Sequence, residues 1–212
     1  MTGTDPRIER AARTIRGGEL VVYPTETVYG LGADALDPAA VERVFEAKGR
    51  PRSNPLSMAV PDVESAARYA ELTDRERQFM REFLPGPVTV VVEAGDEVPD
   101  VLTAGRDRVG VRIPDHETAL SLLERVAPIT ATSANRSGEP SVRRIAALDP
   151  ELREAVEYVL DADDERGSTH HPESEEGEAR GSESTVVDVE RREIHRRGAL
   201  AARIERWLDA EQ

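Results

Sequence analysis

Apolar residues near the start of the chain recur at helical spacing: Ile8, Ala11, Ala12 and Ile15. They follow an Asp5-Pro6 pair, which suits an N-cap and a first helical position, so the pattern predicts a helix that ends near Gly17. The next stretch, residues 19–24, is short and apolar between a glycine and a proline. Such a run predicts a buried strand.

The same two patterns alternate along the rest of the chain. Helical spacing predicts further helices over residues 37–49, 62–70, 73–86, 117–126 and 200–208. Short apolar or alternating runs predict strands over residues 56–60, 87–95, 108–114, 127–132, 157–162, 185–189 and 192–196. Strands that alternate with helices indicate an α/β or mixed α+β protein, with helices packed on a twisted sheet.

Composition narrows this picture to one folded domain. A length of 212 residues fits a single domain, and 38% hydrophobic with only 4% aromatic residues means a core of Val, Leu, Ile and Ala. The absence of cysteine excludes disulfides and thiolate chemistry. The chain has no run of about 18 apolar residues, so we expect no membrane association and a cytoplasmic location.

The net charge is strongly negative, and nearly all the basic residues are arginine. The chain has 42 acidic and 28 basic residues, a net charge of −14, and Lys48 is the only lysine. This balance argues against a broad nucleic-acid-binding surface. It is also a halophilic composition, because at about 1 M salt the Debye length is only ~3 Å and repulsion between carboxylates is largely screened.

One acidic stretch stands apart from the predicted elements. Residues 162–183 lack large apolar side chains and are rich in acid, Gly and Ser. We expect a flexible, solvated insert within a single domain that spans residues 1–212.

The first candidate site segment follows the first predicted strand. Thr25, Glu26 and Thr27 precede Gly30 and Gly32, and such glycines would let backbone amides approach a ligand closely. The alternative is a β-turn in which the threonines cap local amides.

The second segment surrounds the single lysine. Lys48, Arg50 and Arg52 fall within five residues after a predicted helix, which indicates an anion site in so acidic a chain. Cations at a helix C-terminus are a simpler explanation, worth about 0.3–1 kcal/mol. That explanation does not account for the choice of lysine, whereas a tight phosphate pocket would favour a compact ammonium over a guanidinium.

Two later segments could also line a site. Arg108 and Arg112 alternate with valines, so both point to one face of a strand. That face is either an exposed polar surface or part of a site where the arginines bind a carboxylate or phosphate. Residues 130–141 are dense in hydroxyls and amides, which suits either an ordinary loop or the lining of a nucleotide site.

Several well-known motifs are absent from the sequence. There is no GxxxxGK[ST] phosphate loop, no GxGxxG after a strand, no HExxH and no GxSxG. The histidines at 116 and 195 have no ligand-spaced partners, so we predict no protein-held metal.

Six ordered segments together resemble the threonylcarbamoyl-AMP synthase family with the YrdC-like fold, in its single-domain form. They are YPTETVYGLGADA, KGRPRSNPL, LPGPVTVVV, RVGVRIP, TSANRSGEPS and ESTVVD. The resemblance implies a twisted open sheet with flanking helices and a central cleft. It also implies a nucleotidyltransferase that makes threonylcarbamoyl-AMP and pyrophosphate from L-threonine, bicarbonate and ATP, for tRNA modification.

The resemblance also implies site residues at matching positions, and no proton-transfer residue among them. Those implied to hold threonine are Thr25, Arg112, Ser133 and Ser184. Those implied on the ATP side are Lys48, Arg50, Asn54, Arg108, Asn135, Ser141, Arg143 and Arg196. Mg²⁺ would arrive on the ATP, without dedicated protein ligands. Ala59 stands where some family members have a histidine, which leaves part of the threonine pocket unassigned.

Two alternatives stay open at this point. One is a non-catalytic RNA-binding maturation factor with the same fold, which would need a continuous basic concavity. The other is a paralogue that acts on another nucleotide. For the synthase, the partners implied are ATP, L-threonine, bicarbonate and a tRNA threonylcarbamoyl transferase complex that receives the product, with direct tRNA contact undecided.

Overall fold

The computed structural model describes residues 5–161 and 183–210. The helices in this part are α1 (Pro6–Arg16), α2 (Pro38–Lys48), α3 (Val63–Ala66), α4 (Asp74–Phe83), α5 (Asp100–Thr103), α6 (Glu117–Leu123), α7 (Pro150–Ala155) and α8 (Ala201–Ala210), with a 3₁₀ helix at Ile145–Ala147. The strands are β1 (Val21–Tyr23), β2 (Gly30–Gly32), β3 (Ser57–Ala59), β4 (Ala70–Glu71), β5 (Val88–Ala94), β6 (Arg108–Arg112), β7 (Ile129–Ser133), β8 (Tyr158–Val159), β9 (Thr185–Asp188) and β10 (Glu193–Arg196).

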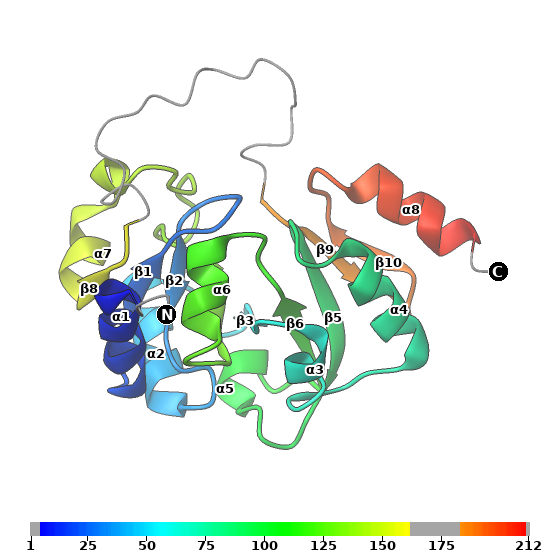
Figure 1. The fold of residues 1–212 in the computed structure, drawn as a ribbon, viewed down its shortest axis with the longest axis horizontal. Coiled ribbons are helices and arrows are strands. Elements are labelled where there is room, and N and C mark those ends of the chain that lie inside the picture. Colours follow the sequence, from blue (N-terminus) through cyan, green and yellow to red (C-terminus); the bar gives the residue numbers. More distant parts are fainter. Residues whose placement is uncertain (1–4, 162–182, 211–212) are drawn as a thin grey trace, which may run out of the picture.

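These strands form one mixed sheet in the order β10-β9-β5-β6-β3-β7-β2-β1-β8, with β4 added at β5. The pairs β1–β8, β3–β6 and β5–β9 are parallel, and the other neighbours run antiparallel. Helices α1, α2 and α7 lie beside the β1, β2 and β8 part of the sheet, and α4 and α8 lie beside β9 and β10 (Figure 1). The open mixed sheet with flanking helices confirms the predicted fold class.

The helices begin where local sequence favours it. Asp5 and Asp37 accept hydrogen bonds from the backbone two residues on, each before a proline at the first helical turn. Thr73 and Glu76 form the predicted capping box of α4. The longer helices α1, α2, α4 and α8 each bury an apolar stripe, and Phe79, Phe83 and Trp207 form an aromatic contact between α4 and α8.

Several elements differ from the sequence prediction. The helix expected over residues 62–70 is shorter, because α3 ends at Ala66 and Ala70 begins β4. Strands β2 and β4, helices α5 and α7, and the 3₁₀ helix were not predicted. The acidic insert expected at 162–183 lies outside the described residues except for Glu183.

Strand β2 needs its two glycines because the ring of Tyr23 lies across them. A Cβ at Gly30 would lie 2.7 Å from Tyr23 Cζ, and one at Gly32 would lie 3.1 Å from Tyr23 Cε1. These glycines therefore make room for the ring of Tyr23, and both that ring and Gly30 line the central cavity.

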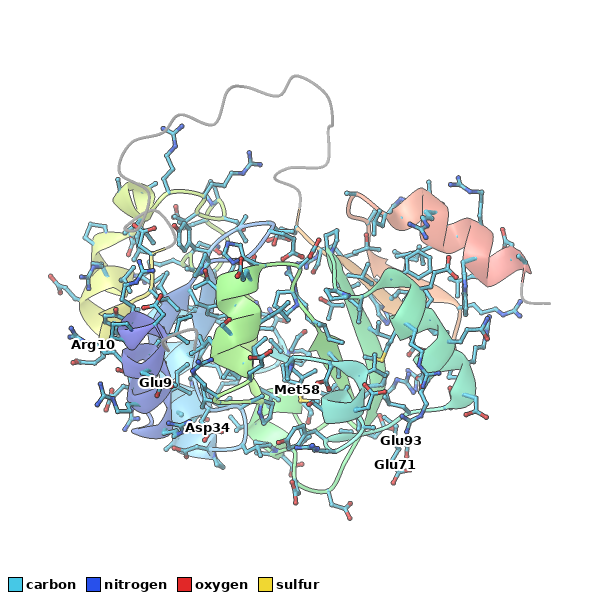
Figure 2. The ribbon with its side chains drawn as sticks, in the orientation of Figure 1. Glu9, Arg10, Asp34, Met58, Glu71 and Glu93 are labelled. Carbon is cyan, nitrogen blue, oxygen red and sulfur yellow. The ribbon has the colours of Figure 1, made fainter. Side chains whose placement is uncertain are left out.

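Acidic side chains are crowded even within the sheet. Glu71 of β4 and Glu93 of β5 are register partners, and Figure 2 shows them side by side at one edge, whereas Met58 lies fully buried near the middle. Like charges directly opposite on neighbouring strands destabilise a sheet. Both side chains are exposed, so salt would screen this repulsion.

No helix in the described part of the chain is long and apolar enough to cross a membrane.

Candidate active site

A central cavity of about 860 Å³ lies against the central strands of the sheet. This volume is in the range of about 300–1,000 Å³ that is typical of small-molecule sites. Its lining comes from segments that are far apart in sequence: the loop after β1, the end of α2, the strands β3, β5, β6 and β7, and the segment from Glu183 to Arg196.

The floor of the cavity is built from small side chains. Ser57, Thr89 and Gly110 meet there, and a Cβ at Gly110 would lie 2.4 Å from Ser57 Oγ and 3.0 Å from Thr89 Cγ2. Ala59 and Ala131 continue this floor. The glycine between Arg108 and Arg112 therefore keeps the space between the two arginines open.

Arg112 defines one end of the cavity, which we call the Arg112 end. Its Nη2 donates to Glu26 Oε1 and to Thr27 Oγ1, each at 2.8 Å. Thr27 Oγ1 lies 3.0 Å from Thr25 Oγ1, which donates to Val28 O at 2.6 Å. The Arg112 and Glu26 side chains are only 13% and 17% exposed, so this ion pair is largely desolvated.

Tyr23 lies at the same end. Burial is the main cause that raises the pKa of the Tyr23 phenol to about 12. Arg112 acts in the opposite direction on this pKa and Glu26 in the same direction, which places the ring in the field of the pair. The phenol stays neutral at physiological pH and gives this end a rigid, partly apolar wall.

Lys48 brings its ammonium to the other side of the cavity. The side chain is 2% exposed, and Nζ donates to Asn135 O at 2.6 Å and to Ser133 O. An ammonium has three donors, so one is left for a ligand. Burial, and next the charge of Arg50, lower the pKa of Lys48 to about 8. Lys48 does end α2, but its ammonium reaches carbonyls at the last residue of strand β7 and two residues after it, which the helix-end explanation did not require.

Arg50 and Arg196 complete what we call the cation end, together with Lys48. Arg50 is held by Asn54 O at 3.0 Å and Pro55 O at 2.9 Å, through Nε and Nη2. Arg196 donates to Ser184 O at 2.9 Å and Ser184 Oγ at 2.8 Å. Burial lowers the pKa of both arginines, the repulsion of Arg196 lowers that of Arg50 further, and the charge of Arg112 lowers that of Arg196, so Arg196 lies in the field of both Arg50 and Arg112. Cations that repel one another in a cavity favour an anionic ligand.

Arg108 lines the cavity but is held by acidic partners. Its Nε lies 3.0 Å from Asp188 Oδ2, its Nη2 lies 3.6 Å from Glu76 Oε1, and Nη2 donates to Val91 O at 2.8 Å. Glu76 and Asp188 are almost fully buried, and burial raises the pKa of Glu76. Arg108 therefore offers a ligand less net positive charge than Arg50 or Arg196.

The cavity gathers most of the site residues expected from the sequence. Those that line it are Thr25, Lys48, Arg50, Arg108, Arg112, Ser133, Asn135, Ser184 and Arg196. Three others lie outside its lining: Asn54, Ser141 and Arg143. Asn54 supplies the carbonyl that holds Arg50, whereas Ser141 and Arg143 line an adjoining hollow that shares Asn135 with the central cavity.

Sequence reasoning gave no specific role to several polar residues at the site, among them Thr89, Asp188, Glu26 and Glu183. Thr89 had a signal, because it is the one hydroxyl among the valines at the start of β5, and its Oγ1 lies 3.0 Å from Ser184 Oγ. Glu26 and Glu183 stood inside segments already singled out. Their arginine partners are 86 and 13 residues away, so no local pattern reports these contacts.

No group of three or more potential metal ligands occurs among the His, Asp and Glu residues within 5–161 and 183–210. The donor set of the cavity is cationic and suits an anion. A Mg²⁺ bound to a polyphosphate would enter as part of that ligand.

The protein is thus of the α/β class, with an open mixed sheet and a central cavity. That cavity carries the desolvated Arg112 and the cations Lys48, Arg50 and Arg196 in its lining, a set of donors suited to anionic ligands. The chain belongs to the Sua5/YciO/YrdC family, because the model of that family, described as "Telomere recombination", matches residues 13–198. The family and fold predicted from six short segments are thus confirmed.

Relatives and solved structures agree with this assignment. The chain is 43% identical over 186 residues to the threonylcarbamoyl-AMP synthase of Pyrococcus abyssi, covering 86% of this chain and 51% of that protein. It is 38% identical over 167 residues to the threonylcarbamoyl-AMP synthase of Bacillus subtilis, covering 76% and 47%. A crystal structure of P. abyssi Sua5 complexed with L-threonine matches with a TM-score of 0.74 at 43% identity, over 85% of this chain and 50% of that one. The chain spans about half the length of these relatives.

Proposed function

We propose that the protein is an L-threonylcarbamoyladenylate synthase, a nucleotidyltransferase that makes threonylcarbamoyl-AMP and pyrophosphate from L-threonine, bicarbonate and ATP. The observation that carries this proposal is one cavity with an Arg112 end and a cation end. Relatives with the name threonylcarbamoyl-AMP synthase, and a relative solved with L-threonine, support the choice of substrates.

Threonine is assigned to the Arg112 end. The guanidinium of Arg112 binds the amino-acid carboxylate, since an arginine held by Glu26 and Thr27 is already oriented for a planar anion. Hydroxyls of Thr25, Ser133 and Ser184 supply the other polar contacts. The Ser184 hydroxyl also accepts from Arg196, so it lies where the two ends meet. Ala59 and the small floor leave room for the threonine side chain.

ATP is assigned to the cation end. Lys48, Arg50 and Arg196 bind phosphate oxygens, with Arg108 and Asn135 beside them, and Mg²⁺ travels on the triphosphate without dedicated protein ligands. Asn54 contributes through its carbonyl to Arg50. Ser141 and Arg143 extend the site into the adjoining hollow.

The reaction follows from this arrangement of charges. The threonine amine takes up bicarbonate and loses water to give an N-carboxylate. A carboxylate oxygen then bonds to the α-phosphorus, the bond to the bridging oxygen of the β-phosphate breaks, and pyrophosphate leaves with its electron pair. Negative charge builds on phosphate oxygens, so positioning and electrostatic stabilisation by Lys48 and Arg50 do most of the work. We assign no side chain a proton-transfer role.

The RNA-binding alternative fits the distribution of arginines less well. Outside the cavity, Arg52 pairs with Glu42 at 2.6 Å, Arg136 pairs with Glu151, and Arg203 lies 3.4 Å from Glu82. Arginines neutralised in this way do not add up to the continuous basic concavity that RNA binding requires. Transfer of the product to a tRNA-modifying complex, direct tRNA contact and a cytoplasmic location stay predictions.

Pyrophosphate release tests the proposal directly. We expect release from ATP to require threonine and bicarbonate together, and to stop when serine or valine replaces threonine at matched concentration. Pyrophosphate release that does not depend on threonine, or does not depend on bicarbonate, would favour a paralogue that acts on another substrate. RNA binding without any release would favour the maturation factor.

A further inference from the structure

The cation end is occupied by a carboxylate of the chain itself. Glu183 Oε2 accepts from Arg196 Nη1 at 2.8 Å, and Glu183 Oε1 accepts from Ser141 Oγ at 3.1 Å. Arg196 and Ser141 are both residues assigned to ATP. One carboxylate therefore engages two groups that a phosphate would use.

The charge of Glu183 also acts on the rest of this end. It favours the charged forms of Lys48, Arg50 and Arg196, against the burial that lowers their pKa values. Glu183 is thus the shared counter-ion of three cations. A phosphate oxygen bound there would face the same three cations and would be repelled by the carboxylate.

The exposure of this ion pair makes it easy to break. The side chains of Arg196 and Glu183 are 44% and 45% exposed, whereas Arg112 and Glu26 are 13% and 17% exposed. Exposed pairs contribute little net stability because water and salt compete with them. The Glu183 carboxylate can therefore leave at small cost, while the Glu26 carboxylate cannot.

We propose that Glu183 is an internal stand-in for a phosphate group, and that a ligand must displace its carboxylate from Arg196 and Ser141 to bind. The residue then sets specificity at this subsite, because a ligand must present more negative charge than one carboxylate to replace it. The identity of that ligand as the triphosphate of ATP rests on the proposed function, but the anion subsite does not.

Equilibrium binding of pyrophosphate, measured by titration calorimetry, tests this proposal without any turnover. Two unit charges about 4 Å apart interact by ~1 kcal/mol in bulk water, so removing the Glu183 charge beside a multiply charged ligand should matter. We expect Glu183→Gln to bind pyrophosphate about tenfold more tightly at low salt. The gain should shrink toward unity in molar KCl.

The matched control is Glu205→Gln. Glu205 pairs with the neighbouring Arg197 on the surface, at similar exposure, and lies outside the cavity lining. We expect its pyrophosphate affinity to equal that of the unmodified protein. A tenfold gain in both variants would mean that only net charge matters, and would overturn the proposal.

Other outcomes are equally decisive. If Glu183→Gln folds normally, as verified by circular dichroism, and yet binds pyrophosphate with unchanged or lower affinity, the Glu183 carboxylate does not compete with the anion. That result would overturn the proposal. Glu183→Ala should bind pyrophosphate at least as tightly as Glu183→Gln, and a loss of affinity would also overturn the proposal. In a crystal with pyrophosphate bound, we expect Glu183 Oε2 more than about 4 Å from Arg196 Nη1, beyond ion-pair distance.

These results are separable from those that test the synthase. If Glu183→Gln tightens pyrophosphate binding while threonine and bicarbonate do not stimulate release, the stand-in survives and the proposed reaction fails. If release behaves as proposed while Glu183→Gln has no effect, the reaction survives and the stand-in fails.

Discussion

The two ends of the central cavity each pair an arginine with a glutamate, but in opposite ways. At the Arg112 end the pair is largely desolvated and also tied to Thr27. At the cation end the Arg196–Glu183 pair is nearly half exposed and shares its charge with Lys48 and Arg50. The first pair is a fixed support, and the second is an exchangeable counter-ion.

This difference suits ligands of different charge. An amino-acid carboxylate carries one charge, so its recognition depends on a guanidinium held in one orientation. A triphosphate carries several charges and can compete with a carboxylate for clustered cations. The comparison therefore predicts large, ligand-specific effects at the Arg112 end and graded, salt-dependent effects at the cation end.

The largest effect should come from Arg112→Ala. Loss of an electrostatic anchor that sets reaction geometry typically costs about 10²–10³ in rate, so threonine-dependent pyrophosphate release should fall by roughly that factor. Binding of pyrophosphate alone should change less than about threefold, because its assigned contacts are Lys48, Arg50 and Arg196, and Arg112 acts there only through its charge on Arg196. Arg197→Ala is the control, and a comparable loss there would point to a general stability effect.

The next effect concerns the support of Arg112. Glu26→Ala leaves the guanidinium without its carboxylate, and removing one partner of a mostly buried pair should lower the free energy of unfolding by about 2 kcal/mol. We expect the KM for threonine to rise about tenfold or more with little change in the KM for ATP. Glu26→Gln keeps an acceptor oxygen and should recover part of the threonine affinity. Equal shifts in both KM values would contradict a fixed support specific to Arg112.

A pH titration sharpens the description of the cation end. Because burial holds the pKa of Lys48 near 8, its ammonium loses its proton as pH rises through that value. Pyrophosphate affinity should therefore fall by up to about tenfold between pH 7 and pH 9. Stability should change in the opposite direction, because from about pH 8 to the unperturbed value of 10.5 the unfolded chain binds more protons, so the Lys48 contribution rises with pH. Binding that is flat over this range in the intact protein would contradict a role for the ammonium.

The smallest effect should come from Arg52→Ala. Arg52 belongs to the same basic cluster in sequence as Lys48 and Arg50, but it pairs with Glu42 on the surface and does not line the cavity. We expect less than a twofold change in pyrophosphate affinity, against a loss of tenfold or more for Arg50→Ala. Similar losses in the two variants would mean that pyrophosphate responds to the summed charge of the cluster and not to direct contact with Arg50.

Much of the fold could be predicted from local sequence. Asp-Pro openings marked α1 and α2, and a capping box marked α4, because these signals act within one turn of helix. The same Asp-Pro opening marks α7 at Asp149 and Pro150, but this helix has six residues and buries only Leu152, so periodicity gave no support. Strand β2 has no β-forming residues at its ends, and its glycines are explained by the ring of Tyr23 and, at Gly32, also by the side chain of Ile129.

The site was predictable to a smaller extent. Alternation along β6 correctly placed Arg108 and Arg112 on one face, since side chains of a strand alternate. The sequence could not indicate that Arg108 would be held by two buried acids while Arg196 would be held by an exposed one. That distinction depends on burial in the folded sheet, and it decides which arginine is free to change partners.

A crystal structure with threonine and a non-hydrolysable ATP analogue bound together tests the central claim most directly. We predict the threonine carboxylate within about 3.2 Å of the Arg112 guanidinium, hydrogen-bond distance, and phosphate oxygens on Lys48, Arg50 and Arg196 in the same cavity. A triphosphate bound at Arg112, or the two ligands on separate surfaces, would contradict the division of the cavity into these two ends.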